Sequence, residues 1–296
     1  MMFGFRDAFD YFQCSHCGCL QISKFPADIS RYYPDDYCAQ KPLPYTPKLR
    51  SLAVSLRDKY ALSGKGLVGK FLHGRHPNPI LSLLSHLPLS KKSSILDVGC
   101  GSGFLLHSLR RLGFKNLQGI DPFNKNDIEC ADGIHIYKKH IHDVVGLWDI
   151  IMFHHSFEHV PDPAETLQTV AGLLPVGGHC LIRIPIVSSY AWEQYGINWA
   201  QLDAPRHYFL HSIKSMQFLA RLAGLELYDT RYDSSHQQLI ACELYQRDIS
   251  LQEYGSYSPE QRDSIFTPKE IAAFVALALD LNESRQGDQA AFYLRK

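Results

Sequence analysis

The pattern of hydrophobic and polar residues divides the chain into an irregular first part and a regular middle part that begins near residue 78. In the middle part, short apolar runs alternate with stretches in which apolar residues recur every three or four positions. The runs predict strands at 93–99, 116–121, 133–138, 148–153 and 179–185. The stretches predict helices, of which the clearest lie at 104–113 and 163–174. This alternation predicts an α/β fold whose mostly parallel sheet is covered by helices on both faces.

The end of the regular part differs from its beginning. Residues 225–233 and 237–245 both resemble strands, and the short turn between them predicts an antiparallel pair that closes the sheet. Thr267 then opens one more helix, with an apolar face for docking. We therefore expect three regions. They are an N-terminal cysteine-knuckle and linker region at 1–75, a ligand-binding domain at 76–245 and a C-terminal helical extension at 246–296.

Composition and charge narrow the function classes. The 296 residues include 30 Lys plus Arg and 30 Asp plus Glu, so the net charge is zero, which argues against a nucleic-acid binder that relies on a basic surface. The longest apolar run, at 271–279, has nine residues, about half the length of a membrane span. The first residues lack the basic and apolar regions of a secretory signal, so we expect a cytoplasmic protein without a membrane span.

The most informative motif is ILDVGCGSGFLL at 95–106. An apolar strand ends in Asp97, and Gly99, Gly101 and Gly103 follow before a helix begins. Glycines accept positive φ angles and have no Cβ, so a ligand can lie directly on the backbone. Asp121 ends the next strand, where a carboxylate can accept hydrogen bonds from ribose hydroxyls. Strand, loop, helix and acid together predict a nucleoside-binding site.

The same loop indicates which nucleoside cofactor binds. A nicotinamide dinucleotide requires a third glycine where this chain has Phe104. The Asp97 carboxylate would also repel a diphosphate, whereas it would attract the amino and sulfonium groups of S-adenosylmethionine (SAM). Charge therefore favours SAM, and an NAD-type Rossmann oxidoreductase remains the disfavoured alternative.

These motifs, with GIDP at 119–122 and HHSFEHVPDP at 154–163, resemble those of the class I SAM-dependent methyltransferases. The resemblance spans about 78–245, and the Glu-His-Val-x-Asp-Pro pattern resembles the small-molecule branch of that superfamily. It implies a Rossmann-like sheet of seven strands with the last one antiparallel. It also implies SAM contacts for Asp97, Gly99, Gly101, Gly103, Asp121, Pro122, His142, Asp143 and His154. A non-catalytic protein of the same fold, which binds a partner, is a second alternative.

Residues 187–212 form a connection that is too long for a plain turn and rich in aromatic side chains, so we expect a lid over the site. Substrate contacts are expected from Trp199, Arg206 and Tyr208. If the acceptor is a hydroxyl, a general base assists methyl transfer. His207 is the first candidate for this base and His155 the second.

The residues that follow the fourth predicted strand, at 148–153, narrow the choice of methyl acceptor. His154-His155-Ser156-Phe157 is neither the Pro-Pro-aromatic run of amino-directed DNA methyltransferases nor the Pro-Cys of base-carbon methyltransferases. Together with zero net charge, this predicts a small-molecule acceptor, for example a sugar or a glycan precursor. The oligomeric state stays open.

Cys14 and Cys17, followed by Gly18, have the Cys-x2-Cys-Gly form of half a zinc ribbon. A structural zinc ion needs four ligands, and Cys19, Cys38 or His16 would have to supply the remainder at poor spacing. A zinc knuckle and a hairpin without metal both remain open, and we assign no metal ligand.

Overall fold

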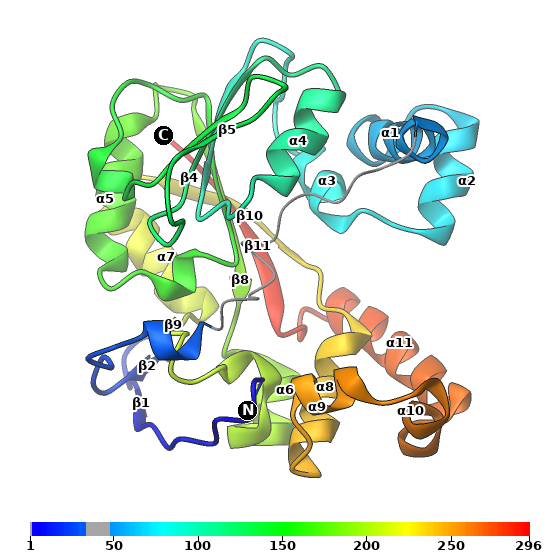
Figure 1. The fold of residues 1–296 in the computed structure, drawn as a ribbon. Coiled ribbons are helices and arrows are strands. Elements are labelled where there is room, and N and C mark those ends of the chain that lie inside the picture. The colour runs from blue at the N-terminus through cyan, green and yellow to red at the C-terminus, as the bar shows by residue number, and fades with distance from the viewer. Residues whose placement is uncertain (1, 34–47) are drawn as a thin grey trace.

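The computed structural model describes residues 2–33 and 48–296 and has an eight-stranded sheet at its centre (Figure 1). The strands lie in the order β10 (Glu226–Tyr232), β11 (Gln289–Arg295), β8 (His179–Pro185), β7 (Ile150–His154), β3 (Ser94–Val98), β4 (Asn116–Ile120), β6 (His135–Tyr137) and β5 (Ile128–Glu129). The five strands from β8 to β6 are parallel, and β11 runs antiparallel to both of its neighbours. The predicted mixed α/β architecture with a mostly parallel sheet is confirmed, although the two-residue β5 makes eight strands where seven were expected.

The predicted hairpin at the end of the sheet is wrong. Residues 237–245 belong to helix α8 (His236–Gln246), which begins with a reciprocal capping box between Ser235 and Gln238. Leu239, Cys242 and Tyr245 are buried at helical spacing, so one face of this helix is part of the core.

The antiparallel partner of β10 is instead the C-terminal strand β11. It lies between β10 and β8, and its residues 290–294 are completely buried. Residues 246–296, which were expected to form a helical extension, therefore also contain a strand of the central sheet. The helices of this region all precede that strand, and they are α9 (Leu251–Ser256), α10 (Pro259–Ile265) and α11 (Pro268–Glu283). Thr267 caps α11 as predicted.

Helices cover both faces of the sheet, as predicted. Apolar residues of α5 (Pro163–Leu173) and α7 (Ile213–Leu222) pack on one face, and those of α3 (Pro79–Leu84) and α4 (Phe104–Arg111) on the other (Figure 1). Asp162 caps α5 by accepting a hydrogen bond from the Glu165 amide at 2.9 Å. Helices α1 (Lys48–Ser63) and α2 (Leu67–Arg75) pack against each other beside α3 and α4.

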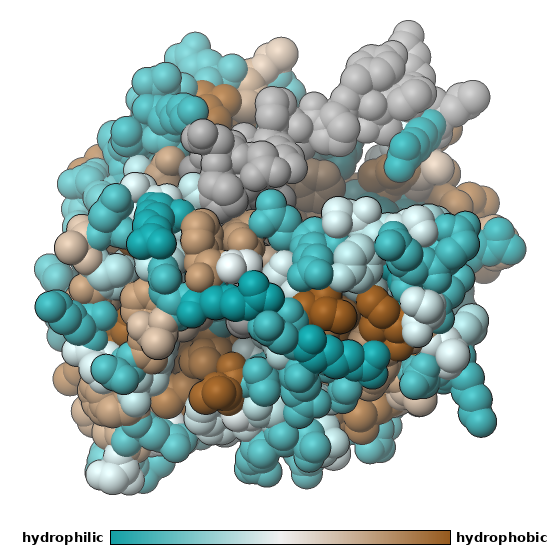
Figure 2. All heavy atoms as spheres, turned by 60° about the horizontal axis from the view of Figure 1, so that its bottom comes forward, coloured by the Kyte–Doolittle hydropathy of each residue, from teal (hydrophilic) through white to brown (hydrophobic). Residues whose placement is uncertain are grey.

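The predicted lid belongs to a third apolar cluster below the sheet (Figure 1). It contains α6 (Tyr190–Tyr195), two 3-10 turns at 196–198 and 200–202, and the two-residue strand β9 (Phe209–Leu210). These elements pack against α8 and α11. They also contact the N-terminal hairpin of β1 (Tyr11–Gln13) and β2 (Leu20–Ile22), since β9 pairs with β2. Figure 2 shows this side of the molecule, where small apolar spots are scattered among hydrophilic side chains.

The cysteine motif forms the turn of this hairpin. Cys19 is buried, with its sulfur 3.8 Å from Nδ1 of His211. Within residues 2–33 and 48–296, two groups of three or more closely spaced His, Cys, Asp or Glu residues occur, and neither includes Cys14 or Cys17. Cys38 and most of the Pro- and Tyr-rich linker, from residue 34 to 47, lie outside the described residues. In the described part of the chain, every helix is too short or too polar to cross a bilayer.

Candidate functional site

A pocket of about 320 Å³ opens at the carboxyl ends of β3, β4 and β7. This edge of a parallel sheet is where open α/β folds bind ligands, and the volume suits a small molecule. Its lining residues are Tyr33, Val98, Gly99, Asp121–Phe123, Lys139–His142, His155, Ser156, His159–Asp162, Glu165 and Thr166.

The glycine loop adopts the backbone conformation that its sequence predicts. Gly99, Gly101 and Gly103 have φ angles of 72°, 55° and 78°. Packing is a second reason for two of these glycines. A Cβ on Gly99 would lie 2.4 Å from Cβ of Ser156, and a Cβ on Gly103 would lie 2.6 Å from Cδ1 of Ile136. The loop is therefore pressed against the neighbouring strand ends, and only Gly99 of the three lines the pocket itself.

Two buried carboxylates adjoin the loop. Asp121 lines the pocket, and Asp97 lies directly before the lining residue Val98. Burial and the nearby charge of Asp121 raise the pKa of Asp97 to about 7. Burial also raises the pKa of Asp121, although the amides of Phe123 and Gly101 oppose this rise by donating to its carboxylate. A buried acidic pair favours a cationic ligand and disfavours a diphosphate, so the residues present fit SAM.

One wall of the pocket comes from a residue far away in the sequence. Tyr33 stacks on Phe123 with 5.6 Å between ring centroids and 20° between ring planes. Together with Ile141, these rings give the pocket an apolar surface on which an adenine ring can lie. The sequence assigns His142 and Asp143, next to Ile141, to the SAM site, whereas Tyr33 belongs to no local motif that would place it there.

Of the remaining residues expected to contact SAM, two line the pocket and two do not. Pro122 and His142 line the pocket, and Nδ1 of His142 lies 2.8 Å from Oγ1 of Thr169. Asp143 instead accepts a hydrogen bond from the His140 amide and caps a 3-10 turn.

His154 is outside the lining, and both of its ring nitrogens are buried without a hydrogen-bond partner in the described part of the chain. Burial lowers the pKa of His154 to about 3, so its ring is neutral at pH 7.

The two candidate bases lie on either side of Glu158. His155 lines the pocket with Nδ1 3.4 Å from Oε1 of Glu158, and its φ angle of 53° turns the backbone at the end of β7. His207 is buried behind the pocket wall, with Nε2 3.9 Å from the same oxygen. His159 packs edge-on against His207, with 4.8 Å between ring centroids. The structure thus brings both predicted histidines together, but only His155 faces the pocket.

The residues expected to contact substrate do not line the pocket. Trp199 is buried in the apolar cluster below the sheet, where its Nε1 donates to Oδ2 of Asp288 at 2.8 Å. Arg206 is paired with Asp203 and lies 5.4 Å from the centroid of the Tyr33 ring. Tyr208 donates its backbone amide to the Glu158 carbonyl, and its ring packs on Phe25. In this structure the lid residues brace the pocket from outside.

Comparison with known proteins agrees with this geometry. The family model described as a methyltransferase domain matches residues 71–230. A ubiquinone biosynthesis O-methyltransferase from Ralstonia nicotianae is 30% identical over 175 residues, which are 53% of this chain and 72% of the relative. The mitochondrial ubiquinone biosynthesis O-methyltransferase of Saccharomyces cerevisiae is 38% identical over 98 residues, which are 29% of this chain and 31% of the relative.

Solved structures show the same fold at low identity. Mycolic acid cyclopropane synthase CmaA1, solved with SAH and CTAB, has a TM-score of 0.50 at 17% identity, over 76% of this chain and 85% of its own. The cyclase SpnF has a TM-score of 0.50 at 12% identity, over 86% of this chain and 98% of its own. Since a synthase and a cyclase share this fold, the fold alone does not name the reaction. The reaction is identified by the family match together with the acidic glycine-loop pocket. The chain belongs to the methyltransferase-domain family and is a class I SAM-dependent methyltransferase.

Proposed function

We propose that the protein methylates a hydroxyl oxygen of a small molecule. The pocket that fits SAM is also lined by His155 and His159, so a small acceptor can enter it beside the acidic glycine loop. The curated relatives at 28–38% identity are named as O-methyltransferases, which supports oxygen as the acceptor atom. The expected sugar or glycan acceptor has no support from these names, so a phenol of the ubiquinol type is the first acceptor to test.

His155 is the general base in this proposal. It is the histidine near Glu158 that both lines the pocket and contacts that carboxylate, and its side chain is 36% exposed. His207, the first choice from the sequence, is 7% exposed and sits behind the wall. His155 therefore accepts the hydroxyl proton, while Glu158 stabilises the imidazolium that results.

The chemical step balances without another reactant. SAM supplies the methyl group, the acceptor oxygen forms a bond to the methyl carbon, and the electrons of the C–S bond return to sulfur. Nδ1 of His155 faces the Glu158 carboxylate, so the hydroxyl proton passes to Nε2 of His155 and then to solvent. The pocket contributes positioning and exclusion of water, which are the main catalytic effects for this reaction.

The contact between His155 and Glu158 at the pocket wall carries this proposal. His155→Asn tests it, because Asn tolerates the positive φ angle at this position. We expect kcat with a ubiquinol-type phenol to fall by ~10²–10⁴, with little change in SAM affinity. Unchanged kcat would remove His155 from the reaction, and turnover of nucleotide sugars but not phenols would assign the acceptor to the sugar class.

A further inference from the structure

Glu158 is a buried carboxylate whose charge is not matched by hydrogen bonds. The residue is completely buried, and neither Oε1 nor Oε2 has a hydrogen-bond partner in the ranges that the structure describes. A buried carboxylate in this state is strongly unfavourable, so such groups normally bind a cation or an ordered donor. The nearest basic groups are imidazoles, at 3.4 Å in His155 and 3.9 Å in His207.

Backbone carbonyls fix the proton positions on two of the neighbouring imidazoles. Nδ1 of His159 lies 2.7 Å from the Arg206 carbonyl oxygen, and Nδ1 of His207 lies 2.7 Å from the Gln201 carbonyl oxygen. A carbonyl oxygen can only accept, so each Nδ1 carries the proton and each Nε2 keeps its lone pair. Metal-binding histidines are usually oriented in this way, by a hydrogen bond from the other ring nitrogen.

We propose that Glu158, His159 and His207 bind a divalent cation of the zinc type at the inner wall of the pocket. One potential ligand atom from each residue lies within 4.8 Å of the other two. Two imidazoles and one carboxylate suit a borderline cation such as Zn²⁺, and three protein ligands leave a coordination position open. Mg²⁺ prefers oxygen ligands and is expected to bind more weakly.

The surrounding charges do not oppose this assignment. Arg206 is the nearby permanent cation, and Asp203 pairs with it. Asp203 also lies 3.6 Å from Nε2 of His207, so a second carboxylate adds negative potential on that side. A cation here would neutralise Glu158 and would join the loop after β7 to the lid segment that contains His207.

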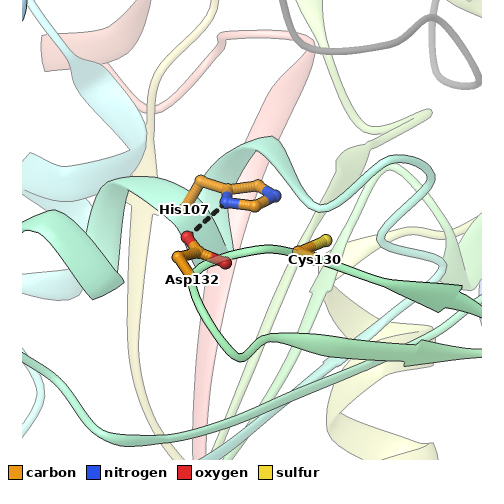
Figure 3. Close-up of side chains that lie close together, drawn as sticks. All are labelled: His107, Cys130 and Asp132. Carbon is orange, nitrogen blue, oxygen red and sulfur yellow. Dashed lines mark hydrogen bonds and ion pairs between the residues drawn. The ribbon is translucent and has the colours of Figure 1, made fainter.

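A second group of potential ligands offers a contrast. His107, Cys130 and Asp132 lie together on α4 and the β5–β6 hairpin (Figure 3). Here Nδ1 of His107 and Oδ2 of Asp132 already pair at 2.7 Å, and the Asp132 side chain is 35% exposed. These two groups satisfy each other and water, so this group lacks the unmatched buried charge that distinguishes Glu158.

The cation site deepens the proposed function and rests on it for its role in the reaction. His155 and His159 line the pocket, so a cation bound by His159 would lie where an acceptor hydroxyl can approach it. A divalent cation lowers the pKa of a bound hydroxyl, which would assist proton transfer to His155. The acceptor class this favours is a phenol with a second oxygen next to the reacting hydroxyl.

The test is zinc binding by the 296-residue chain, followed by calorimetry and by elemental analysis after dialysis. We expect one tightly bound Zn²⁺ per chain, at least 10-fold weaker binding of Mg²⁺, and at least 100-fold weaker Zn²⁺ binding in Glu158→Gln and His207→Gln. The matched control, Asp132→Asn, should bind Zn²⁺ as the wild type does. Absence of zinc binding by the wild type, or loss of zinc only in Asp132→Asn, would overturn the site.

A spectrum of the Co²⁺-substituted wild type covers the case in which the variants do not fold. Ligation by imidazole and carboxylate predicts visible d–d bands without a near-ultraviolet thiolate charge-transfer band. A strong thiolate band would place the ion on cysteine instead and contradict the proposal. Methyl transfer is assayed separately, so zinc bound through Glu158 with no phenol turnover refutes the acceptor proposal alone, and phenol turnover by protein that binds no zinc refutes the cation site alone.

Discussion

The carboxylate of Asp121 accepts a hydrogen bond from the backbone amide of Gly101, with 2.8 Å between Oδ2 and N. Its second oxygen accepts from the Phe123 amide at 2.9 Å. Asp121, at the end of β4, is thus tied to the glycine loop after β3, and these two parts of the pocket edge form one unit. If Asp121 binds the ribose as the resemblance implies, a change at this residue should affect both ligand affinity and the position of the loop.

Replacing Asp97 with Asn should raise stability and weaken SAM binding. Burial raises the pKa of Asp97 above its usual value, to about 7, so the folded state holds this proton more tightly than the unfolded state does. Stability is therefore lost as pH rises from about 4 to about 7, by about 1.4 kcal/mol for each unit by which the two pKa values differ. The Tm advantage of Asp97→Asn should be larger at pH 8 than at pH 5, in thermal melts at both pH values. Equal Tm differences at the two pH values would contradict this assignment.

SAM binding should release protons near neutral pH. The cationic ligand stabilises the ionised form of Asp97 and so lowers a pKa that burial has raised. Calorimetry at pH 6.5 in two buffers of different ionisation enthalpy should give different apparent binding enthalpies, with a fraction of a proton released. Asp97→Asn should abolish the difference. Wild-type enthalpies that do not depend on the buffer would argue against an Asp97–ligand interaction.

Gly99→Ala should cost more stability than its positive φ angle explains. A Cβ at this position lies 2.4 Å from Cβ of Ser156, so we expect roughly 2–4 kcal/mol of destabilisation by urea unfolding. The matched control is Gly177→Ala, which has a φ angle of 80° with no heavy atom within 4 Å of the new Cβ and should cost only about 1–2 kcal/mol. Adding Ser156→Gly to Gly99→Ala should recover part of the loss, and equal costs for the two alanine variants would refute the packing argument.

Trp199→Phe should reduce stability without affecting catalysis. The indole donates to the buried Asp288 at 2.8 Å, and removing a donor from a buried carboxylate costs about 1–3 kcal/mol. Trp192→Phe, in the same cluster, is the control, because it leaves this hydrogen bond in place. Denaturation should separate the two variants, while SAM affinity and acceptor KM stay unchanged. A raised acceptor KM in stable Trp199→Phe would restore the substrate role that the sequence suggested.

The parts of the site that the sequence predicts are those encoded by a short continuous motif. Asp97, Gly99 and Asp121 lie at the ends of successive buried strands, and parallel strands bring their carboxyl ends to one edge. The helix at 163–173 was equally predictable, because Asp162 and Pro163 mark its start locally.

The incorrect or missing predictions depend on long-range packing. Strand β10 pairs with β11, whose residues begin 57 positions after the end of β10, and no local pattern reveals such a partner. The α8 residues resemble a strand in composition, although their capping box and buried spacing are helical. Trp199 has the residue type of a substrate contact, and only the packing of the lid segment on α8 and the N-terminal hairpin buries it.

Calorimetric titration of SAM and of NAD into wild type and Asp121→Asn tests the binding site most directly. We predict that SAM binds the wild type, that NAD binds at least 10-fold more weakly, and that Asp121→Asn weakens SAM binding about 10-fold or more through its lost charge-assisted hydrogen bonds to ribose. Tighter binding of NAD than of SAM, or SAM affinity that is unchanged in Asp121→Asn, would contradict the assignment of this acidic glycine-loop pocket as the SAM site.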